Sequence, residues 1–440
     1  MRPGLQPLHD LHHLFDAGQQ LVTLGNGVRV LTLALPHQPT ATVSVFVRSG
    51  SGHERPRSNG IGHVIEHMAF KGTSQRDARR LNLDAERLGA EVNAHTDKDH
   101  TAFHMRGLAA DAPRLLRMLG DIVQHATFPD AELQREREVL LHEFAEDADD
   151  PMSAAYKLFD RACHGSHPLA QPVIGSRANI QRFSRDDLVA HVQRQYTGAN
   201  VVVAAAGAID IDAVQREAEA CFGGLVRGSE NRLSAPAWLG GVRARAQPGS
   251  GQTHLVLGFP IPPLQADDPA ATLAAALLGE GMSSPLMDQL REQRGLVYYA
   301  ACSADLIDSA GQFVIEASTA PGQVDDCVAA LAQLLLDQVE AISPIDLERA
   351  RNQTLVRQLH ALDKPGRRIE DAALDLLVHG HLRSRADWLA RLHAVSAGRL
   401  RDSFTAMAAA GAALAITGRV PRGQAERAQA ALAARGLMRA

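Results

Sequence analysis

The sequence predicts an α+β protein with two related domains, each a mainly antiparallel sheet packed with helices. Three observations predict this fold class. The 440 residues suffice for about two to four domains. Strand-like and helical segments interleave irregularly, with hairpin signals between strands. The order of elements also starts again near the middle of the chain, which is typical of a duplicated domain.

The first half begins with strands. Residues 21–24 and 28–33 flank Gly25-Asn26-Gly27, a tight-turn signal, and therefore predict a hairpin. The β-branched run 40–47 is long enough for a central strand. A helix is expected to run through residues 63–67 and to stop at Gly72. Further helices are expected at 78–88, 108–125, 130–146 and 185–196, and extended segments at 94–105 and 201–207.

A change of composition separates the halves. The stretch 223–251 is rich in Gly, Arg, Ser and Pro and lacks periodicity. We therefore predict one domain at 1–225, a linker at 226–250 and a second domain at 251–440. In the second domain, strands are expected at 254–259, 297–305, 312–318 and 412–418, and helices at 270–291, 324–341, 344–362, 368–379 and 392–407.

Composition excludes several functional classes. The net charge is −5 and aromatic residues are only 4%, so no nucleic-acid partner is expected. No run of about 18 apolar residues predicts a membrane span, and residues 1–25 lack the apolar core of a secretory signal. The four cysteines are far apart and form no CxxC pair. Free thiols in a reducing compartment follow from that spacing, and we expect a cytoplasmic protein.

The motif H-x-x-E-H, formed by His63, Glu66 and His67, is the strongest chemical signal. Histidines four apart share one helix face and can bind one metal ion. Glu66 lies at the edge of that face, where a carboxylate can reach water beside the metal. The alternative is a polar helix face without a metal.

A third metal ligand is expected on the predicted helix around residues 132–149. Leu133, Glu136, Leu140, Glu143 and Asp147 form one helical stripe. A buried carboxylate without a partner is costly, so a metal and its histidines would explain glutamates in an inward-facing stripe. The alternative is a solvated helix, and His142 or Glu146 could take the place of Glu143.

Several sequence blocks resemble the M16 family of zinc peptidases, the insulinase and mitochondrial-processing-peptidase group, in its short two-domain branch. The blocks are 60–73, around the motif, 89–96, and 136–143. Glu143 follows His67 by 76 positions, which is in keeping with the family. The pair Val64-Ile65 departs from the bulkier residues usual in the family and indicates a specialised branch.

The resemblance implies a LuxS/MPP-like metallohydrolase fold with two domains that close as a clamshell, and a Zn2+ cofactor. His63, His67 and Glu143 would be the metal ligands. Glu66 would be the general base that takes a proton from the attacking water and passes it to the leaving amine. Glu136 would orient a ligand histidine.

The second half resembles the family's Arg/Tyr element through Arg291 and Tyr298, which stand seven apart. In the family such a pair binds substrate or stabilises the oxyanion. Asn93, Ala94 and Thr96 would lie on an edge strand to which a peptide adds as a further strand. For Arg291 the alternative is an ordinary helix-end arginine, and for Tyr298 a core tyrosine.

His95, His100 and His104 raise the question of a second metal site. Their spacing on an extended segment assures no shared face, so structural or surface histidines are the expected interpretation.

The sequence therefore predicts a zinc metalloendopeptidase that hydrolyses small unstructured peptides or precursor segments inside a closed chamber. A homodimer is expected, or a heterodimer with another M16-type subunit. One alternative is a non-catalytic peptide-binding or scaffold subunit of a heteromeric complex. The other is a dedicated maturation protease for a ribosomally made peptide.

Overall fold

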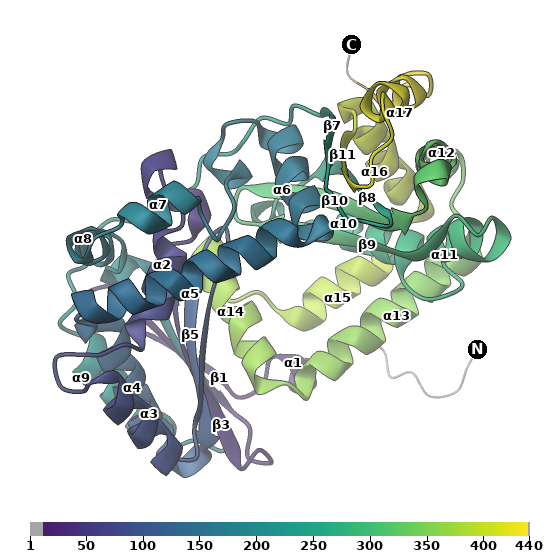
Figure 1. Cartoon of the computed structure of the whole chain (residues 1–440). Coiled ribbons are helices and arrows are strands. Elements are labelled where there is room, and N and C mark those ends of the chain that lie inside the picture. Colours follow the sequence, from purple (N-terminus) through teal and green to yellow (C-terminus); the bar gives the residue numbers. More distant parts are fainter. Residues whose placement is uncertain (1–11, 439–440) are drawn as a thin grey trace. The chain divides into compact units, whose positions relative to one another are not determined.

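The computed structural model describes residues 12–438, which divide into two compact units (Figure 1). Each unit is discontinuous in sequence. Unit 1 comprises the residues up to 144, 172–233 and 359–386, and unit 2 comprises 145–171, 234–358 and the residues from 387 onward. Residues 1–11, part of the stretch expected to lack a secretory signal, lie outside the described residues, as do 439–440.

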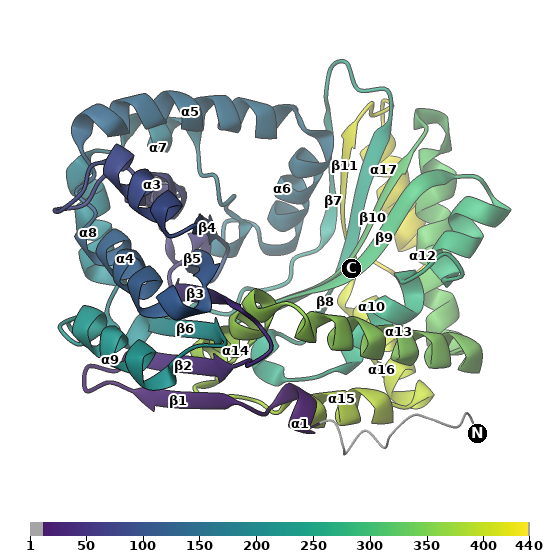
Figure 2. The same ribbon diagram turned by 90° about the horizontal axis from the view of Figure 1, so that it is seen from below.

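Unit 1 is built on a six-stranded sheet with the strand order β1-β2-β6-β3-β5-β4 (Figure 2). Only β2 and β6 pair in parallel, and the other neighbours are antiparallel. Its strands are β1 (Gln19–Thr23), β2 (Arg29–Ala34), β3 (Thr40–Val47), β4 (Glu91–Thr96), β5 (Thr101–Leu108) and β6 (Val201–Gly207). Its helices, assigned by where most of their residues lie, are α1 (His12–Phe15), α2 (Ile61–Ala69), α3 (Ala78–Arg87), α4 (Ala112–His125), α5 (Asp130–Asp149), α7 (Arg177–Arg182), α8 (Arg185–Gln195), α9 (Ile211–Phe222) and α14 (Pro365–His379).

Both faces of this sheet are buried, because alternate residues of each strand point to opposite sides. On one face Val43, Val45 and Phe103 pack into a large core with helices α2, α4, α8 and α9. On the other face Phe46 and Val202 pack against α14. The strands β3 and β6, central and apolar on both sides, are therefore typical of a sheet covered on two faces.

Unit 2 repeats this plan with a five-stranded sheet of order β7-β11-β8-β10-β9, in which only β7 and β11 are parallel. Its strands are β7 (Gly241–Ala246), β8 (Thr253–Ile261), β9 (Val297–Ile307), β10 (Ala310–Thr319) and β11 (Ala413–Gly418). Its helices are α6 (Pro151–His164), α10 (Ala270–Gly279), α11 (Pro285–Met287), α12 (Val324–Glu340), α13 (Pro344–Leu362), α15 (Arg385–Ala394), α16 (Ala397–Ala410) and α17 (Gln424–Ala433). Helices α10, α12 and α16 cover one face, and α6 covers the other through Phe159 and Cys163.

The two sheets correspond strand by strand, with β2, β6, β3, β5 and β4 matching β7, β11, β8, β10 and β9. This correspondence confirms the predicted fold class, two related α+β domains with mainly antiparallel sheets. The two halves of the chain also exchange one helix each. The helix that covers the second face of each sheet, α14 or α6, comes from the other half of the chain.

Several predicted segments differ from the structure at turns. Residues 94–105 are two strands, because the chain reverses at Asp97–His100 and β4 pairs with β5. The predicted linker 226–250 contains β7, which extends the second sheet. The long helices expected at 270–291 and 392–407 are each interrupted. The exchange also means that the compact units differ from the linear division at 1–225 and 251–440.

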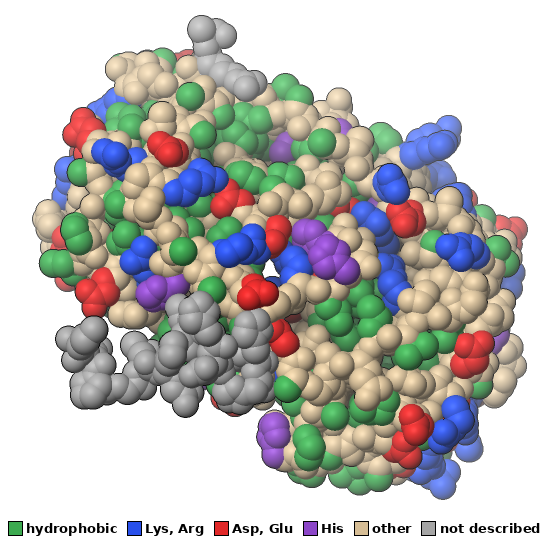
Figure 3. All heavy atoms as spheres, turned by 180° about the vertical axis from the view of Figure 1, so that it is seen from behind, with side chains coloured by type: hydrophobic (Ala, Val, Ile, Leu, Met, Phe, Trp, Pro, Cys, Tyr) green, Lys and Arg blue, Asp and Glu red, His purple; other side chains and the backbone are tan. Residues whose placement is uncertain are grey.

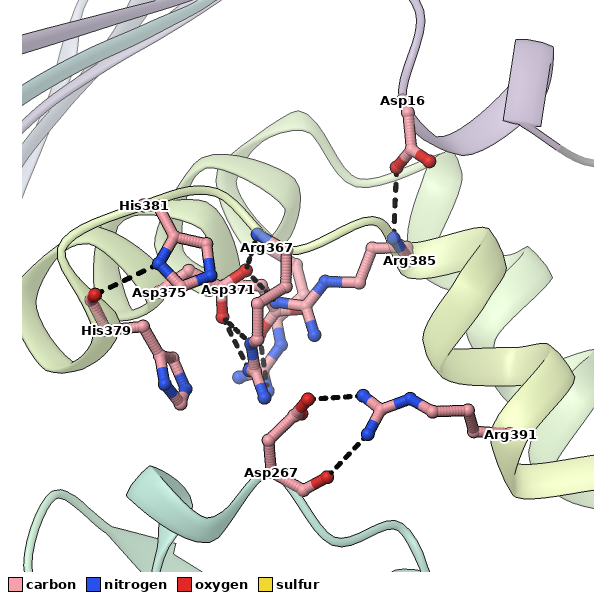
Figure 4. A network of polar contacts seen from close by, with 10 residues as sticks. Asp16, Asp267, Arg367, Asp371, Asp375, His379, His381, Arg385 and Arg391 are labelled. Atoms are coloured by element: carbon pink, nitrogen blue, oxygen red, sulfur yellow. Dashed lines mark hydrogen bonds and ion pairs between the residues drawn. The ribbon is translucent and has the colours of Figure 1, made fainter.

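A polar network holds the end of α14 on unit 1 (Figure 4). Asp375, 1% exposed, pairs with Arg383 at 2.5 Å and with Arg385 at 3.5 Å. The backbone N–H of Arg385 also donates to Asp16 Oδ1 at 3.0 Å. A buried carboxylate is stable only with such partners, so these contacts hold the segment that follows α14 against the last turns of the helix.

The surface in Figure 3 intersperses Lys and Arg with Asp and Glu side chains on the face that is drawn. Within residues 12–438, no single helix has the length and apolar character needed to cross a membrane. One pair, Pro321–Glu340 with Pro344–Leu362, bent by 101°, meets that test only when both helices are counted together.

Shortening Leu376 should destabilise unit 1. Its side chain is fully buried between α14 and the sheet, so we expect Leu376→Ala to lower the free energy of unfolding by about 2–5 kcal/mol. Leu83→Ala on α3, where the side chain is 44% exposed, is the matched control. Equal losses for the two variants in urea denaturation would contradict the packing of α14.

Candidate metal centre

Helix α2 separates apolar from polar residues. Ile61, Val64, Ile65 and Met68 are buried in the core of unit 1, and their spacing forms one helical stripe. His63, Glu66 and His67 therefore lie together away from that stripe. The prediction that the motif is helical is confirmed, although the helix ends at Ala69, before Gly72.

The beginning of α2 is held by Glu54. Its carboxylate accepts hydrogen bonds from the backbone N–H groups of Gly60 at 2.7 Å and Gly62 at 2.8 Å, donors that a helix start leaves unpaired. Burial raises the pKa of Glu54 to about 7, although these hydrogen bonds act to lower it. Gly60 has φ 95° and lies so close to Gly175 that a Cβ would meet its Cα at 2.7 Å. Only glycine fits there.

Helix α5 supplies the carboxylates. Leu133, Glu136 and Leu140 are buried, as the predicted stripe requires, and Glu143 follows two turns after Glu136. Asp147, the last member of the stripe, pairs with Lys157.

His63, His67 and Glu143 converge on one point. Glu143 Oε1 lies 3.6 Å from His63 Nε2, and Glu143 Oε2 lies 3.5 Å from His67 Nε2. Zinc bonds of 2.0–2.2 Å in a tetrahedron place neighbouring ligand atoms about 3.3–3.5 Å apart. The three side chains, whose ligand atoms all lie within 4.8 Å of one another, therefore fit one metal ion.

Glu136 forms a hydrogen bond with His67. Its Oε1 accepts the Nδ1–H of His67 at 3.0 Å, and its Oε2 accepts from Lys71 Nζ at 2.6 Å. Burial acts to raise the pKa of Glu136, but the Lys71 and His67 hydrogen bonds outweigh it and leave that pKa below its usual value. Since Nδ1 carries the proton, Nε2 of His67 keeps its lone pair toward Glu143.

Glu66 is placed beside this cluster. Burial raises the pKa of its carboxyl group, with Glu143 acting in the same direction, while Thr96 and His67 act to lower it. Its Oε2 is buried and accepts no hydrogen bond from any residue that the structure describes. A lone pair with no protein donor is available to a water or a substrate proton.

The predicted edge strand is confirmed, since β4 ends the sheet order of unit 1. Val92 and Ala94 pack on the α2 side, whereas Asn93 lines a pocket on the opposite face. Side chains alternate along a strand. Of the predicted substrate residues, Ala94 and Thr96 therefore lie on the face of the sheet that carries α2, and Asn93 lies on the opposite face. Asn93 Oδ1 accepts the N–H of Ala94 at 2.9 Å.

Arg291 and Tyr298 meet within unit 2. Arg291 lies in a π-helix, Asp288–Gln293, a rare form frequent at functional sites. Its guanidinium carbon is 5.6 Å from the ring centre of Tyr298, within range of a cation–π contact. Tyr298 is 80% exposed, so the alternative of a core tyrosine is wrong. Tyr299 instead donates to Glu316 at 2.6 Å.

Sequence reasoning missed Lys71 and Glu54. Lys71 stands in the block around the motif, and its spacing of four from His67 could have indicated a contact near that histidine. Glu54 precedes α2 across a loop, and no periodicity connects it to the helix.

Comparison with known proteins gives the class. Residues 29–177 match the family described as insulinase (peptidase family M16), and residues 182–354 match the peptidase M16 inactive domain. The chain belongs to peptidase family M16. It is similar to an uncharacterized zinc protease of Rickettsia bellii, with 30% identity over 81% of this chain and 87% of that one.

The chain is also similar to a cytochrome b-c1 complex subunit and, in fold, to a protease of known structure. Cytochrome b-c1 complex subunit 1 of Bos taurus is 27% identical over 87% of this chain and 82% of its own. The crystal structure of a protease from Helicobacter pylori shares the fold, with a TM-score of 0.82, 21% identity, and coverage of 91% of this chain and 99% of that one.

Removing the Glu136 carboxylate should weaken metal binding. Without that acceptor His67 loses the partner that fixes its tautomer, so we expect Glu136→Ala to lower zinc affinity about 10- to 100-fold. Glu138→Ala, an exposed position on the same helix, is the control. Chelator competition measures both, and unchanged affinity in Glu136→Ala would contradict the orienting role.

Proposed function

We propose that the protein is a zinc-dependent endopeptidase acting on unstructured peptides or precursor segments. One observation carries the proposal. Two imidazoles from α2 and a carboxylate from α5 converge at ligand spacing, and the Oε2 of Glu66 beside them has no protein partner in the described chain. This donor set, His₂Glu with an adjacent carboxylate, is that of a catalytic zinc site.

Each residue of the cluster has a role suited to its type. His63, His67 and Glu143 would hold the ion, and Glu136 with Lys71 would keep His67 in its tautomer. When bound, zinc supplies a Lewis acid that polarises the scissile carbonyl and acidifies water. Glu66 Oε2 would accept the proton of the attacking water and later deliver it to the leaving amine.

The edge strand β4 would bind the substrate. Its backbone is paired with β5 on one side only, and the N–H of Ala94 is bonded to the side chain of Asn93, not to another strand. A peptide in extended conformation could displace that side chain and pair with the backbone. Recognition through main-chain bonds makes little demand on sequence, which suits unstructured peptides.

Arg291 and Tyr298 would bind the substrate or stabilise the oxyanion. Stacking on the Tyr298 ring limits the freedom of the guanidinium, and a donor fixed before the reaction stabilises developing charge best. The Sδ of Met282, in the turn before α11, lies 3.8 Å from Arg291 Nη1 and is a further contact of the guanidinium.

We further propose a cytoplasmic homodimer, or a heterodimer with another M16-type subunit. The four cysteines form no disulfide, as suits a reducing compartment.

The competing function is a peptide-binding subunit without catalysis, which the similarity to a cytochrome b-c1 complex subunit favours. A zinc-loaded protein that cuts no peptide, alone or with a partner, would support that function. A protease dedicated to the maturation of one ribosomally made peptide is a narrower version of the proposed endopeptidase.

Glu66→Gln should keep zinc and lose turnover. The amide cannot accept the water's proton, so we expect kcat for a quenched peptide to fall about 10²- to 10⁴-fold with unchanged zinc content by elemental analysis. Glu86→Gln, an exposed glutamate on α3, should match the wild type. Undiminished hydrolysis by Glu66→Gln would remove Glu66 from its role.

Arg291→Ala should leave the zinc content unchanged and weaken peptide cleavage. Loss of one oxyanion donor costs about 10²- to 10³-fold in kcat, whereas loss of a binding contact alone raises KM. Arg294→Ala, exposed in the following turn, is the control. Zinc loss in Arg291→Ala, or equal effects of the two variants, would show that Arg291 is misassigned.

A further inference from the structure

A second cluster of metal-binding side chains lies in unit 1. His95 belongs to β4, His100 ends the turn before β5, and Glu370 belongs to α14. Their ligand atoms all lie within 4.8 Å of one another. His95 Nε2 is 3.4 Å from His100 Nε2 and 3.7 Å from Glu370 Oε1.

These distances suit a shared ion better than a shared proton. Hydrogen bonds to nitrogen donors have a mode near 2.9–3.0 Å, and both separations are clearly longer. Ligand atoms on one tetrahedral zinc are about 3.3–3.5 Å apart, close to what is observed. The spacing also matches the 3.5 and 3.6 Å found between Glu143 and the α2 histidines.

Both imidazoles are held by partners behind them. Asp99 Oδ1 lies 2.7 Å from His100 Nδ1, and His104 Nε2 lies 3.1 Å from His95 Nδ1. His104 Nδ1 in turn lies 2.7 Å from Ser44 Oγ. A cation at the centre selects the tautomers in which both Nδ1 atoms carry the proton and both Nε2 atoms present lone pairs. A carboxylate or ring acceptor behind each ligand is the usual support of a metal site.

An entry path leads to the cluster. His95 and Glu370 line a pocket of about 760 Å³ between the sheet face and the start of α14, together with Asn93 and His104. Glu370 Oε2 is also 3.5 Å from Arg367 Nη1, which leaves Oε1 directed to His95. His100 is buried, with 4% of its surface exposed. An ion would therefore reach the cluster from the pocket, through His95 and Glu370.

We propose that His95, His100 and Glu370 bind a divalent transition metal ion, with Zn²⁺ the best match. Two imidazoles and a carboxylate suit zinc, nickel or cobalt. The ion would join the β4–β5 hairpin to α14, segments about 270 residues apart in the chain, and its remaining position would face the pocket. Residues 95 and 96 alternate across β4, so this site lies on the face of the sheet opposite α2.

Metal stoichiometry tests the proposal in the full chain. After equilibrium dialysis against micromolar Zn²⁺, His95→Gln and Glu370→Gln should each bind one equivalent fewer than the wild type. His37→Gln, an exposed histidine before β3, should bind as many as the wild type. The same difference is expected in a Glu143→Ala background, so the result does not depend on the proposed catalytic site.

Two outcomes would overturn the second site. The first is that His95→Gln and Glu370→Gln, folded by circular dichroism, retain the wild-type equivalents, which would leave the cluster as a hydrogen-bonded pair of histidines with an acidic neighbour. The second is that His37→Gln loses the same equivalent, which would make the bound ion a surface contaminant. Cobalt substitution in the Glu143→Ala background gives an independent readout, because a site with imidazole and carboxylate ligands changes the visible absorption of Co²⁺. In that background, the change should disappear when His95→Gln is added.

Discussion

The hydrogen bond between His67 Nδ1 and Glu136 Oε1 is the contact on which the proposed metal centre depends. It joins α2 to α5, fixes the tautomer of one proposed ligand, His67, and leaves its Nε2 directed at Glu143. Lys71 offsets the cost of burying Glu136 by a second contact at 2.6 Å. Glu54 acts at the other end of α2 by holding its first N–H groups. Both ends of this short helix are therefore tied to carboxylates, so the histidines have little freedom to turn away.

In unit 1 the interior strands form the core, and the edge strand β4 borders the candidate sites. The interior strands β3 and β6 are covered on both sides and supply stability. The edge strand β4 has one unpaired side. One set of its side chains, which includes Ala94, packs on the side of the sheet that carries α2. The other set contributes His95 to the opposite face. Because side chains alternate along a strand, one six-residue segment can border two separate groups of proposed metal ligands. Substitutions at neighbouring positions of β4 should thus affect different chemistry.

Local pattern was enough to predict much of this protein. The limits of β3, β6 and α13 and the helical motif follow from β-branching, periodicity and capping, and the α5 stripe indicated Glu136 and Glu143. Three features could not be predicted from the local pattern. The reversal at Asp97–His100 carries no Gly or Pro, so the hairpin read as one extended segment. β7 has an Arg-rich, exposed pattern and gains its strand character only from pairing with β11. Glu370 lies in another part of the chain, and nothing near His95 in sequence points to it.

The exchange of α6 and α14 has a consequence for how the chain can be divided. A fragment ending near residue 225 would keep the first sheet but lose α14, and would expose Phe46, Val202 and their neighbours to water. A fragment beginning near residue 251 would lose α6, and also β7, from the second sheet. Neither piece would carry a complete core, so separately produced halves should aggregate unless they are synthesised together. Gene fission of such a protein at its apparent midpoint is therefore disfavoured, because each half needs a helix from the other half to complete its core.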